Sequence, residues 1–131
     1  MRIEFTDRFD IPSATAQQRG HGAHGKTWES PGLKAARAAW QAFFERHRPE
    51  KPLEGAIAVC AALFYHAAVK RVTPKTTRPD LDNLAKVIGD ALMAAGIVAE
   101  DSTIYHWDIY KFNTPTEENV AFRIFSNKRG E

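Results

Sequence analysis

The 131-residue sequence predicts a single small α+β domain. Two stretches have the hydrophobic spacing of helices, and four others have the alternation or the apolar runs that are typical of strands. With 44% hydrophobic and 11% aromatic residues, the chain can form one proper core, and a second domain would be cramped. The net charge of +2 permits binding to nucleic acid without requiring it.

The chain has one cysteine, Cys60, and lacks long apolar segments. Cys60 lies in an apolar run, so we expect a buried, inert thiol and no disulfide within the chain. No stretch approaches the roughly 20 apolar residues that cross a bilayer. The start MRIEFTDRFD also lacks the apolar core of a signal peptide. We therefore expect a cytoplasmic protein with no membrane association.

The N-terminal part of the chain contains one strand and one long polar segment. Residues 2–9 alternate well enough to predict an edge strand, which ends near Pro12. Residues 13–29 hold three glycines and several basic residues, so we expect a mobile basic loop rather than a packed element. His21 and His24 could bind a metal, but no cysteine or carboxylate partner lies near them. A loop that is solvated or contacts phosphates is the better interpretation.

A first helix is predicted over residues 31–47, because Ser30 suits the N-cap position and Pro31 the first turn. Apolar or aromatic side chains recur at helical spacing along it, namely Leu33, Ala36, Trp40, Phe43 and His47. The other face is polar. Its cations Lys34 and Arg37 are either solvated or contact a phosphate backbone.

The middle of the chain predicts a strand and a basic loop. Residues 53–66 form an apolar run that we interpret as a central strand buried on both faces, although the alanines leave a helix open. Residues 67–79 lose hydrophobic periodicity and predict a loop. Its cations are Lys70, Arg71, Lys75 and Arg78. This loop is either simply solvated or holds a polyanion beside the acidic residues that follow.

A second helix is predicted over residues 80–95 and is the clearest helix in the chain. Its apolar residues repeat at spacings of three and four, at Leu81, Leu84, Ile88, Leu92 and Ala95. Gly96 is placed to cap its C-terminal end.

The last third of the chain predicts two strands, over residues 103–112 and 120–125. We expect them to form a hairpin around the turn at residues 113–118 and to close the sheet. Residues 127–131 predict a frayed tail.

Acidic residues cluster around the second predicted helix. Asp80 and Asp82 stand two residues apart at its start, and Glu100 and Asp101 follow its end. Carboxylate oxygens in such a pattern suit a hard divalent cation. The more ordinary interpretation makes Asp80 an N-cap and Asp82 a partner of the helix dipole. Lys86 on the same helix and the basic loop before it favour a metal site.

These residues resemble a known family. The run RPDLDNLAKVIGDAL, the later GIVAEDS and Lys111 closely resemble the RusA family of Holliday junction resolvases, metal-dependent endonucleases common in phages and prophages. The resemblance covers roughly residues 70–125, with weaker support from the N-terminal strand and the first helix. Residues 17–28 do not reproduce the family's junction-facing loop. The resemblance implies a dimeric domain with a mixed β-sheet packed with two main helices.

The resemblance also implies roles for particular residues. Asp80, Asp82 and Asp101 correspond to the family's three essential aspartates, and Glu100 to a further acid that binds or supports the metal. Lys86 corresponds to the motif lysine, which offsets charge in the transition state or orients the attacking water. The implied cofactor is Mg²⁺, with Mn²⁺ as an alternative ion. The implied phosphate contacts are Lys70, Arg71, Lys75, Arg78 and Lys111.

The length of the second helix predicts how the acidic residues meet. From Asp82 to Ala95 a helix runs about 20 Å at about 1.5 Å per residue, and residues 96–101 must return that distance nearly fully extended, at about 3.3 Å each. One chain can barely close the site. If two subunits pair these helices antiparallel, Asp101 of one lies near Asp80 of the other. We therefore expect a homodimer with composite sites.

The sequence thus predicts an Mg²⁺-dependent endodeoxyribonuclease that resolves four-way DNA junctions by paired phosphodiester hydrolysis in recombination and repair. One alternative is a metal-dependent nuclease for flaps, forks or other branched DNA. Another is a DNA-binding protein without catalysis, whose aspartates only cap helices. The aromatic residues Tyr105 and Trp107 either stack at an opened junction or belong to the core.

Overall fold

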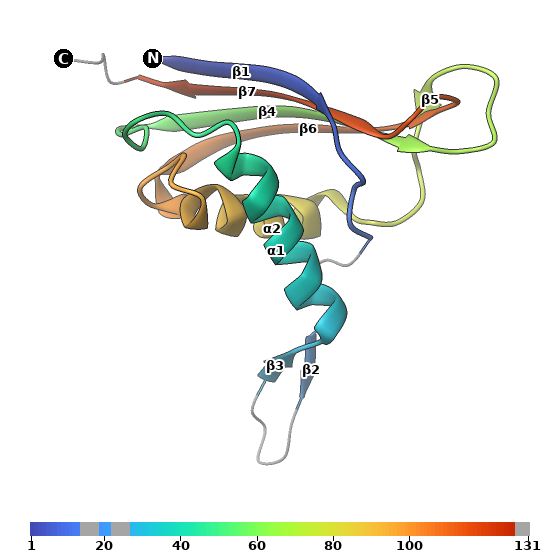
Figure 1. Cartoon of the computed structure of the whole chain (residues 1–131), viewed down its shortest axis with the longest axis horizontal. Helices are drawn as coiled ribbons and strands as arrows, with labels where there is room; N and C mark the ends of the chain where they lie inside the picture. Colours follow the sequence, from blue (N-terminus) through green and yellow to red (C-terminus); the bar gives the residue numbers. More distant parts are fainter. Residues whose placement is uncertain (14–18, 22–26, 128–131) are drawn as a thin grey trace.

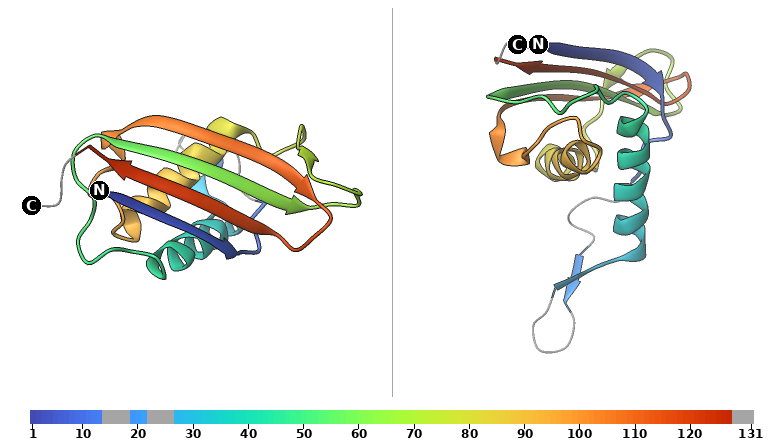
Figure 2. Two further views of the ribbon diagram at one scale, coloured as in Figure 1. Left: turned by 90° about the horizontal axis from the view of Figure 1, so that it is seen from above. Right: turned by 60° about the vertical axis from the view of Figure 1, so that its left-hand side comes forward.

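The computed structural model describes residues 1–13, 19–21 and 27–127 of the chain. Five strands form one mixed sheet, and two helices pack against one of its faces (Figures 1 and 2). The elements of this domain are β1 (Arg2–Arg8), α1 (Pro31–Glu45), β4 (Ile57–His66), β5 (Thr73–Pro74), α2 (Leu81–Ala94), β6 (Ile104–Thr114) and β7 (Asn119–Ser126). The predicted α+β class, with two main helices on a mixed sheet, is confirmed.

The sheet has the order β1-β7-β4-β6-β5, so β4 is the central strand and β1 an edge strand, as predicted. The side chains of β4 alternate: those at Ile57, Val59, Ala61, Leu63 and Tyr65 are buried, and those between them are only half-buried. The prediction that β4 is buried on both faces was therefore wrong. The reason is that both helices lie on the same side of the sheet and leave its other face open (Figure 2).

Cys60 belongs to this open face. It is half-buried and stands apart from the apolar core, so the prediction of a buried thiol was also wrong. Alternation along a strand assigns Cys60 to the face opposite its neighbours Val59 and Ala61. The apolar run in the sequence could not reveal this, because alanine and cysteine are tolerated on either face of a strand.

The predicted hairpin between the last two strands was wrong as well. Both strands exist, but β4 lies between them, parallel to β6 and antiparallel to β7. Ala61 of β4 is thus flanked by Ile109 of β6 on one side and Phe122 of β7 on the other. Strands β6 and β7 therefore both pair with β4, the most apolar strand of the chain, and not with each other. Residues 115–118 carry the chain past the end of β4.

Helix α1 begins as the sequence predicts. The Ser30 hydroxyl accepts a hydrogen bond from the Leu33 N–H at 3.1 Å, and Pro31 occupies the first turn. The helix ends at Glu45, two residues before the predicted end. Its fully buried side chains include Trp40 and Phe44, which both pack edge-on against the Phe122 ring of the sheet.

The polar face of α1 is partly used for packing. Arg37 donates a hydrogen bond to the Asp90 carboxylate of α2 at 2.9 Å, and both side chains are 29% exposed. Arg37 was predicted to be solvated or to contact phosphate, and instead it links the two helices. Lys34 is exposed.

Helix α2 spans Leu81–Ala94, close to the predicted range. It buries Leu84, Val87, Ile88, Ala91 and Leu92 against the sheet and α1. Gly96 follows with a φ of 80°, a left-handed conformation that glycine adopts without strain, as its predicted capping role requires.

Two segments predicted as loops contain short strands. In the N-terminal segment, β2 (Arg19–His21) pairs antiparallel with β3 (Thr27–Glu29), beyond the N-terminal end of α1 (Figure 1). The prediction of a loop was wrong for these residues, whereas His24 and the end of the tail lie outside the described residues. In the basic loop, β5 pairs with β6, so the prediction was wrong at these two residues also. Within the described part of the chain, no helix is long and apolar enough to cross a membrane.

Candidate active site

The start of α2 carries the first group of predicted site residues. Asp80 occupies the N-cap position, and its backbone carbonyl accepts the Leu84 N–H at 3.0 Å. Asp82 lies in the first turn, and Lys86 stands four residues later on the same face of the helix. All three side chains are exposed. A negatively charged first turn followed by a lysine is thus presented to solvent.

Lys111 holds the backbone that leads into this turn. Its ammonium donates one hydrogen bond to the carbonyl of Thr77 at 2.7 Å and another to the carbonyl of Pro79 at 2.6 Å. Lys111 projects from β6 on the helix side of the sheet, since its β4 partner is the buried Leu63. Two of the three donors of the ammonium are therefore committed to the residues just before Asp80.

These two hydrogen bonds, which we call the Lys111 clamp, have no local signal in the sequence. Lys111 and Pro79 are 32 residues apart in the sequence. The lysine reaches the backbone before α2 because β6 pairs with β4 in the sheet. The phosphate contact that the resemblance implies for Lys111 stays a prediction, although the ammonium keeps one further donor.

The second acidic group lies further along α2. Asp101 opens a short 3₁₀ turn, η3 (Asp101–Thr103), and Glu100 precedes it; both are exposed. A Cβ atom placed on Gly89 would lie 4.0 Å from the Asp101 Cβ, so Asp101 sits beside the middle of α2. Gly89 follows Asp82 by seven residues, which is about 10 Å along a helix axis. The two acidic groups therefore lie at different positions along the axis of α2.

One chain thus brings Asp80 and Asp82 together and leaves Glu100 and Asp101 apart from them. Among the residues that the structure describes, one group of three side chains has ligand atoms mutually within 4.8 Å, and it contains none of these four carboxylates. The group consists of Cys60, His106 and Asp108. Sequence reasoning missed it, because its members meet only through the pairing of β4 with β6.

The basic loop begins where β4 ends, beyond the end of the sheet, and its last residues lead back beneath the sheet to the start of α2 (Figure 1). Lys70, Arg71 and Arg78 are exposed, and Arg78 is two residues from Asp80. Lys75 is more engaged: it donates a hydrogen bond to the Thr77 hydroxyl at 2.9 Å and lies 5.1 Å from the centre of the Tyr65 ring. Of the loop's cations, Arg78 is therefore the one that the chain places next to the carboxylates of α2.

The two aromatic residues of the strand after Asp101 differ in role. Trp107 is half-buried against the core, and its ring would come within 3.3 Å of a Cβ on Gly89. The packing interpretation is therefore correct for Trp107, and Gly89 provides the room that the ring needs. Tyr105 is 70% exposed, and its stacking on DNA stays a prediction.

The donor chemistry of the predicted residues fits a hard divalent cation. Four exposed carboxylates supply only oxygen ligands, which Mg²⁺ and Mn²⁺ prefer over nitrogen or sulfur. Asp80 and Asp82 are positioned by a helix start, and Asp101 by a short turn. Within one chain, the full set would not surround a single ion without a change of position.

A small α+β domain that presents carboxylates and a lysine from one helix, with a basic loop that leads into that helix, is typical of a metal-assisted nuclease. The sequence model of the endodeoxyribonuclease RusA family matches residues 11–124, nearly the whole chain, and the chain belongs to this family. It is an endodeoxyribonuclease, a hydrolase of DNA phosphodiester bonds. A comparison with curated proteins finds no match.

Membership of the family carries two broader properties. The family's activity is the resolution of Holliday junctions, and its nucleases generally depend on a divalent metal. The match also begins at residue 11, so it includes α1 and the N-terminal segment, where the resemblance in the sequence was weak.

Proposed function

We propose that the protein is an Mg²⁺-dependent resolvase that cuts four-way DNA junctions by paired nicks in recombination and repair. The observation that carries the proposal is the clamped start of α2, where Lys111 fixes the backbone before Asp80 and Asp82. Catalytic groups that act on a phosphate need a fixed position, and a backbone held by two charge-assisted hydrogen bonds supplies one. We also propose that the protein acts in the cytoplasm.

The proposed metal ligands are Asp80, Asp82 and Asp101, with Glu100 as a further ligand or supporting acid. A bound Mg²⁺, or Mn²⁺ in its place, would polarise the scissile phosphate and lower the pKa of the attacking water. Asp82 lies in the first turn of α2, where a negatively charged side chain interacts favourably with the helix dipole.

Positively charged side chains complete the proposed site. Lys86 lies one turn after Asp82 and is exposed, so its ammonium can offset the charge that builds up on the phosphate. Arg78, Lys70 and Arg71 are exposed on the loop that leads into α2 and would bind phosphates without reading bases. Lys75 and Lys111 are tied to the loop itself, so we assign them a smaller part of the binding energy.

We further propose that two subunits complete each site. In one chain Asp101 is level with Gly89, about 10 Å along the helix from Asp82. If two α2 helices cross antiparallel near Lys86, Asp101 of one subunit comes level with Asp82 of the other. Helix α2 also exposes Met93, an apolar side chain two turns after Lys86 on the same face, which such a pairing could cover. Two symmetric sites would suit the paired nicks of junction resolution.

The test of the activity is cleavage of a labelled synthetic four-way junction in Mg²⁺, beside linear duplex and flap controls. We expect symmetric nicks in the wild type and a loss of about 10²–10³-fold in Asp82→Asn. Asp90→Asn is the matched control, because it makes the same change on the same helix at a residue bound to Arg37. Equal cutting of flaps and junctions would contradict the proposal and support a nuclease for branched DNA in general. Binding without cutting would support a DNA-binding protein without catalysis.

The test of the shared site is subunit mixing. Asp82→Asn and Asp101→Asn proteins are each inactive in this proposal, and mixing them creates dimers in which one site has all its ligands. We expect the mixture to recover activity above either parent. Separate sites, each built from one chain, would leave the mixture as inactive as its components.

A further inference from the structure

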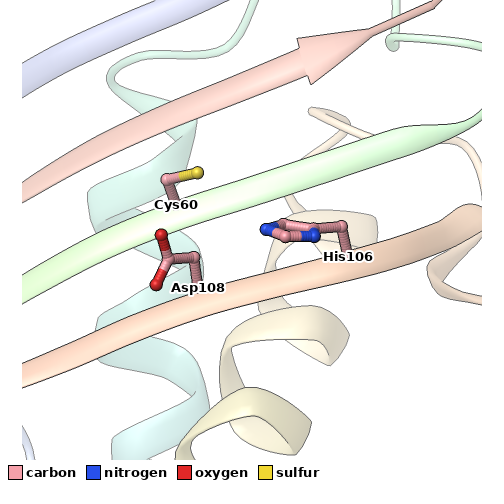
Figure 3. Close-up of side chains that lie close together, drawn as sticks. All are labelled: Cys60, His106 and Asp108. Atoms are coloured by element: carbon pink, nitrogen blue, oxygen red, sulfur yellow. The ribbon is translucent and has the colours of Figure 1, made fainter.

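The open face of the sheet carries a cluster of three possible metal ligands, Cys60, His106 and Asp108 (Figure 3). Strands β4 and β6 run parallel, with Cys60 opposite Asp108 and Ala58 opposite His106. His106 and Asp108 are two residues apart on β6, so both face the same side as Cys60. The ligand atoms of the three side chains all lie within 4.8 Å of one another.

We propose that Cys60, His106 and Asp108 bind one Zn²⁺ ion, at a site separate from the nuclease carboxylates. Sulfur, imidazole nitrogen and carboxylate oxygen are the three ligand types that proteins use for zinc. A cysteine ligand selects against Mg²⁺, which prefers oxygen ligands alone. Three protein ligands leave the fourth tetrahedral position for water, because the cluster is on the face of the sheet opposite the two helices.

The geometry suits this ion after small side-chain movements. Tetrahedral zinc, with a bond of about 2.3 Å to sulfur and about 2.0–2.1 Å to nitrogen or oxygen, separates its ligand atoms by roughly 3.4–3.6 Å. The three atoms lie within 4.8 Å of one another, so each pair has to approach by at most about 1.2–1.4 Å. His106 is exposed and Asp108 half-buried, so both can rotate. Because β4 is paired on both sides, we expect these movements to occur in the side chains and not in the backbone.

The charges around the cluster also suit a dication. Burial raises the pKa of the Cys60 thiol, the Asp108 carboxylate raises it further, and Arg123 lowers it in part. Arg123 is opposite Cys60 on β7, and its charge is balanced by Glu4 at 3.2 Å. A Zn²⁺ ion would replace the thiol proton and neutralise the thiolate and the carboxylate together.

The experiment is a titration of metal-free, full-length protein with Zn²⁺ and, separately, Co²⁺, in excess Mg²⁺ to occupy oxygen-ligand sites. We expect one Zn²⁺ per chain, and a thiolate-to-metal charge-transfer band with Co²⁺ that carboxylates alone cannot produce. Cys60→Ala should abolish the band. Cys60→Ala, His106→Ala and Asp108→Asn should each weaken zinc binding by at least about a hundredfold, more than the loss of a supporting residue causes.

His66→Ala is the matched control, because His66 is an exposed histidine at the end of β4, the strand that carries Cys60, and lies outside the cluster. It should bind zinc as the wild type does. Thermal unfolding gives a second readout: zinc at about a hundred times its Kd should raise the Tm of the wild type by roughly 5–10 °C and leave that of Cys60→Ala unchanged. Zinc binding that survives Cys60→Ala, or Co²⁺ binding without the thiolate band, would overturn the proposal.

Discussion

The two helices begin in different ways. At the start of α1, the Ser30 side chain accepts the Leu33 N–H, so the cap is supplied by the helix's own sequence. At the start of α2, Lys111 holds the carbonyls of Thr77 and Pro79 from a strand that is remote in sequence. A local cap needs only a few adjacent residues. A clamp from a distant strand fixes the helix start relative to the sheet, which is what a site built on that start requires.

The two helices also differ in the side chains that they bury and expose. Helix α1 buries Trp40 and Phe44 among the aromatic side chains of the core. Helix α2 buries an aliphatic stripe and leaves Asp82 and Lys86 exposed on its first turns. We infer that α1 mainly stabilises the fold, while α2 both packs and presents the proposed catalytic groups.

The largest effect is expected from Trp40→Ala, which removes the anchor of α1. Trp40 is fully buried, so the cavity should lower the free energy of unfolding by about 3–5 kcal/mol. Urea unfolding measures this loss. Tyr105→Ala is the aromatic control, since Tyr105 is 70% exposed and its removal should cost less than about 0.5 kcal/mol. Similar losses in both variants would contradict the role given to α1.

The next effect is expected from Lys111→Met, which removes the clamp of α2. Losing two charge-assisted hydrogen bonds should lower the free energy of unfolding by about 1–3 kcal/mol. In the folded variant, the start of α2 should be less well fixed, so half-maximal cleavage should need more Mg²⁺. Titration of cleavage with Mg²⁺ checks this.

Lys75→Met is the control for the clamp, because Lys75 donates to the Thr77 side chain and not to the Pro79 carbonyl. It should leave the Mg²⁺ requirement unchanged. If Lys111→Met instead weakens DNA binding at an unchanged Mg²⁺ requirement, Lys111 is the phosphate contact that the family resemblance implies.

A smaller effect is expected from Ser30→Ala, which removes the local cap of α1. The loss should be about 1 kcal/mol, and Ser30→Asp should retain most of the stability because its carboxylate can accept the same N–H. Cleavage by folded protein should be unchanged in both variants. A changed Mg²⁺ requirement in Ser30→Ala would show that the two helix starts are not independent.

The smallest effect is expected from the contact between the helices. Arg37 and Asp90 are 2.9 Å apart and partly exposed, so solvent weakens their attraction. A double-mutant cycle with Arg37→Met and Asp90→Asn should give a coupling of about 1 kcal/mol or less. A much larger coupling would mean that the helices act as one rigid unit.

Much of the fold follows from local patterns in the sequence. The Ser30 cap, the stripe of α2 and Gly96 are each signalled by residues that lie within a few positions of one another. The order of the strands is different. Both β6 and β7 pair with β4, and nothing within either strand distinguishes this from a hairpin.

The sequence by itself determined the two helices, the strands of the main sheet apart from β5, and the acidic residues that the family resemblance identifies. These features depend on side-chain periodicity, capping and motif spacing, which are all short-range. The tertiary structure alone decided the strand order, the level of Asp101 beside Gly89, the clamp by Lys111 and the cluster at Cys60. Each of these joins residues far apart in the chain, and their meeting is set by strand register and by the packing of the helices on one face of the sheet.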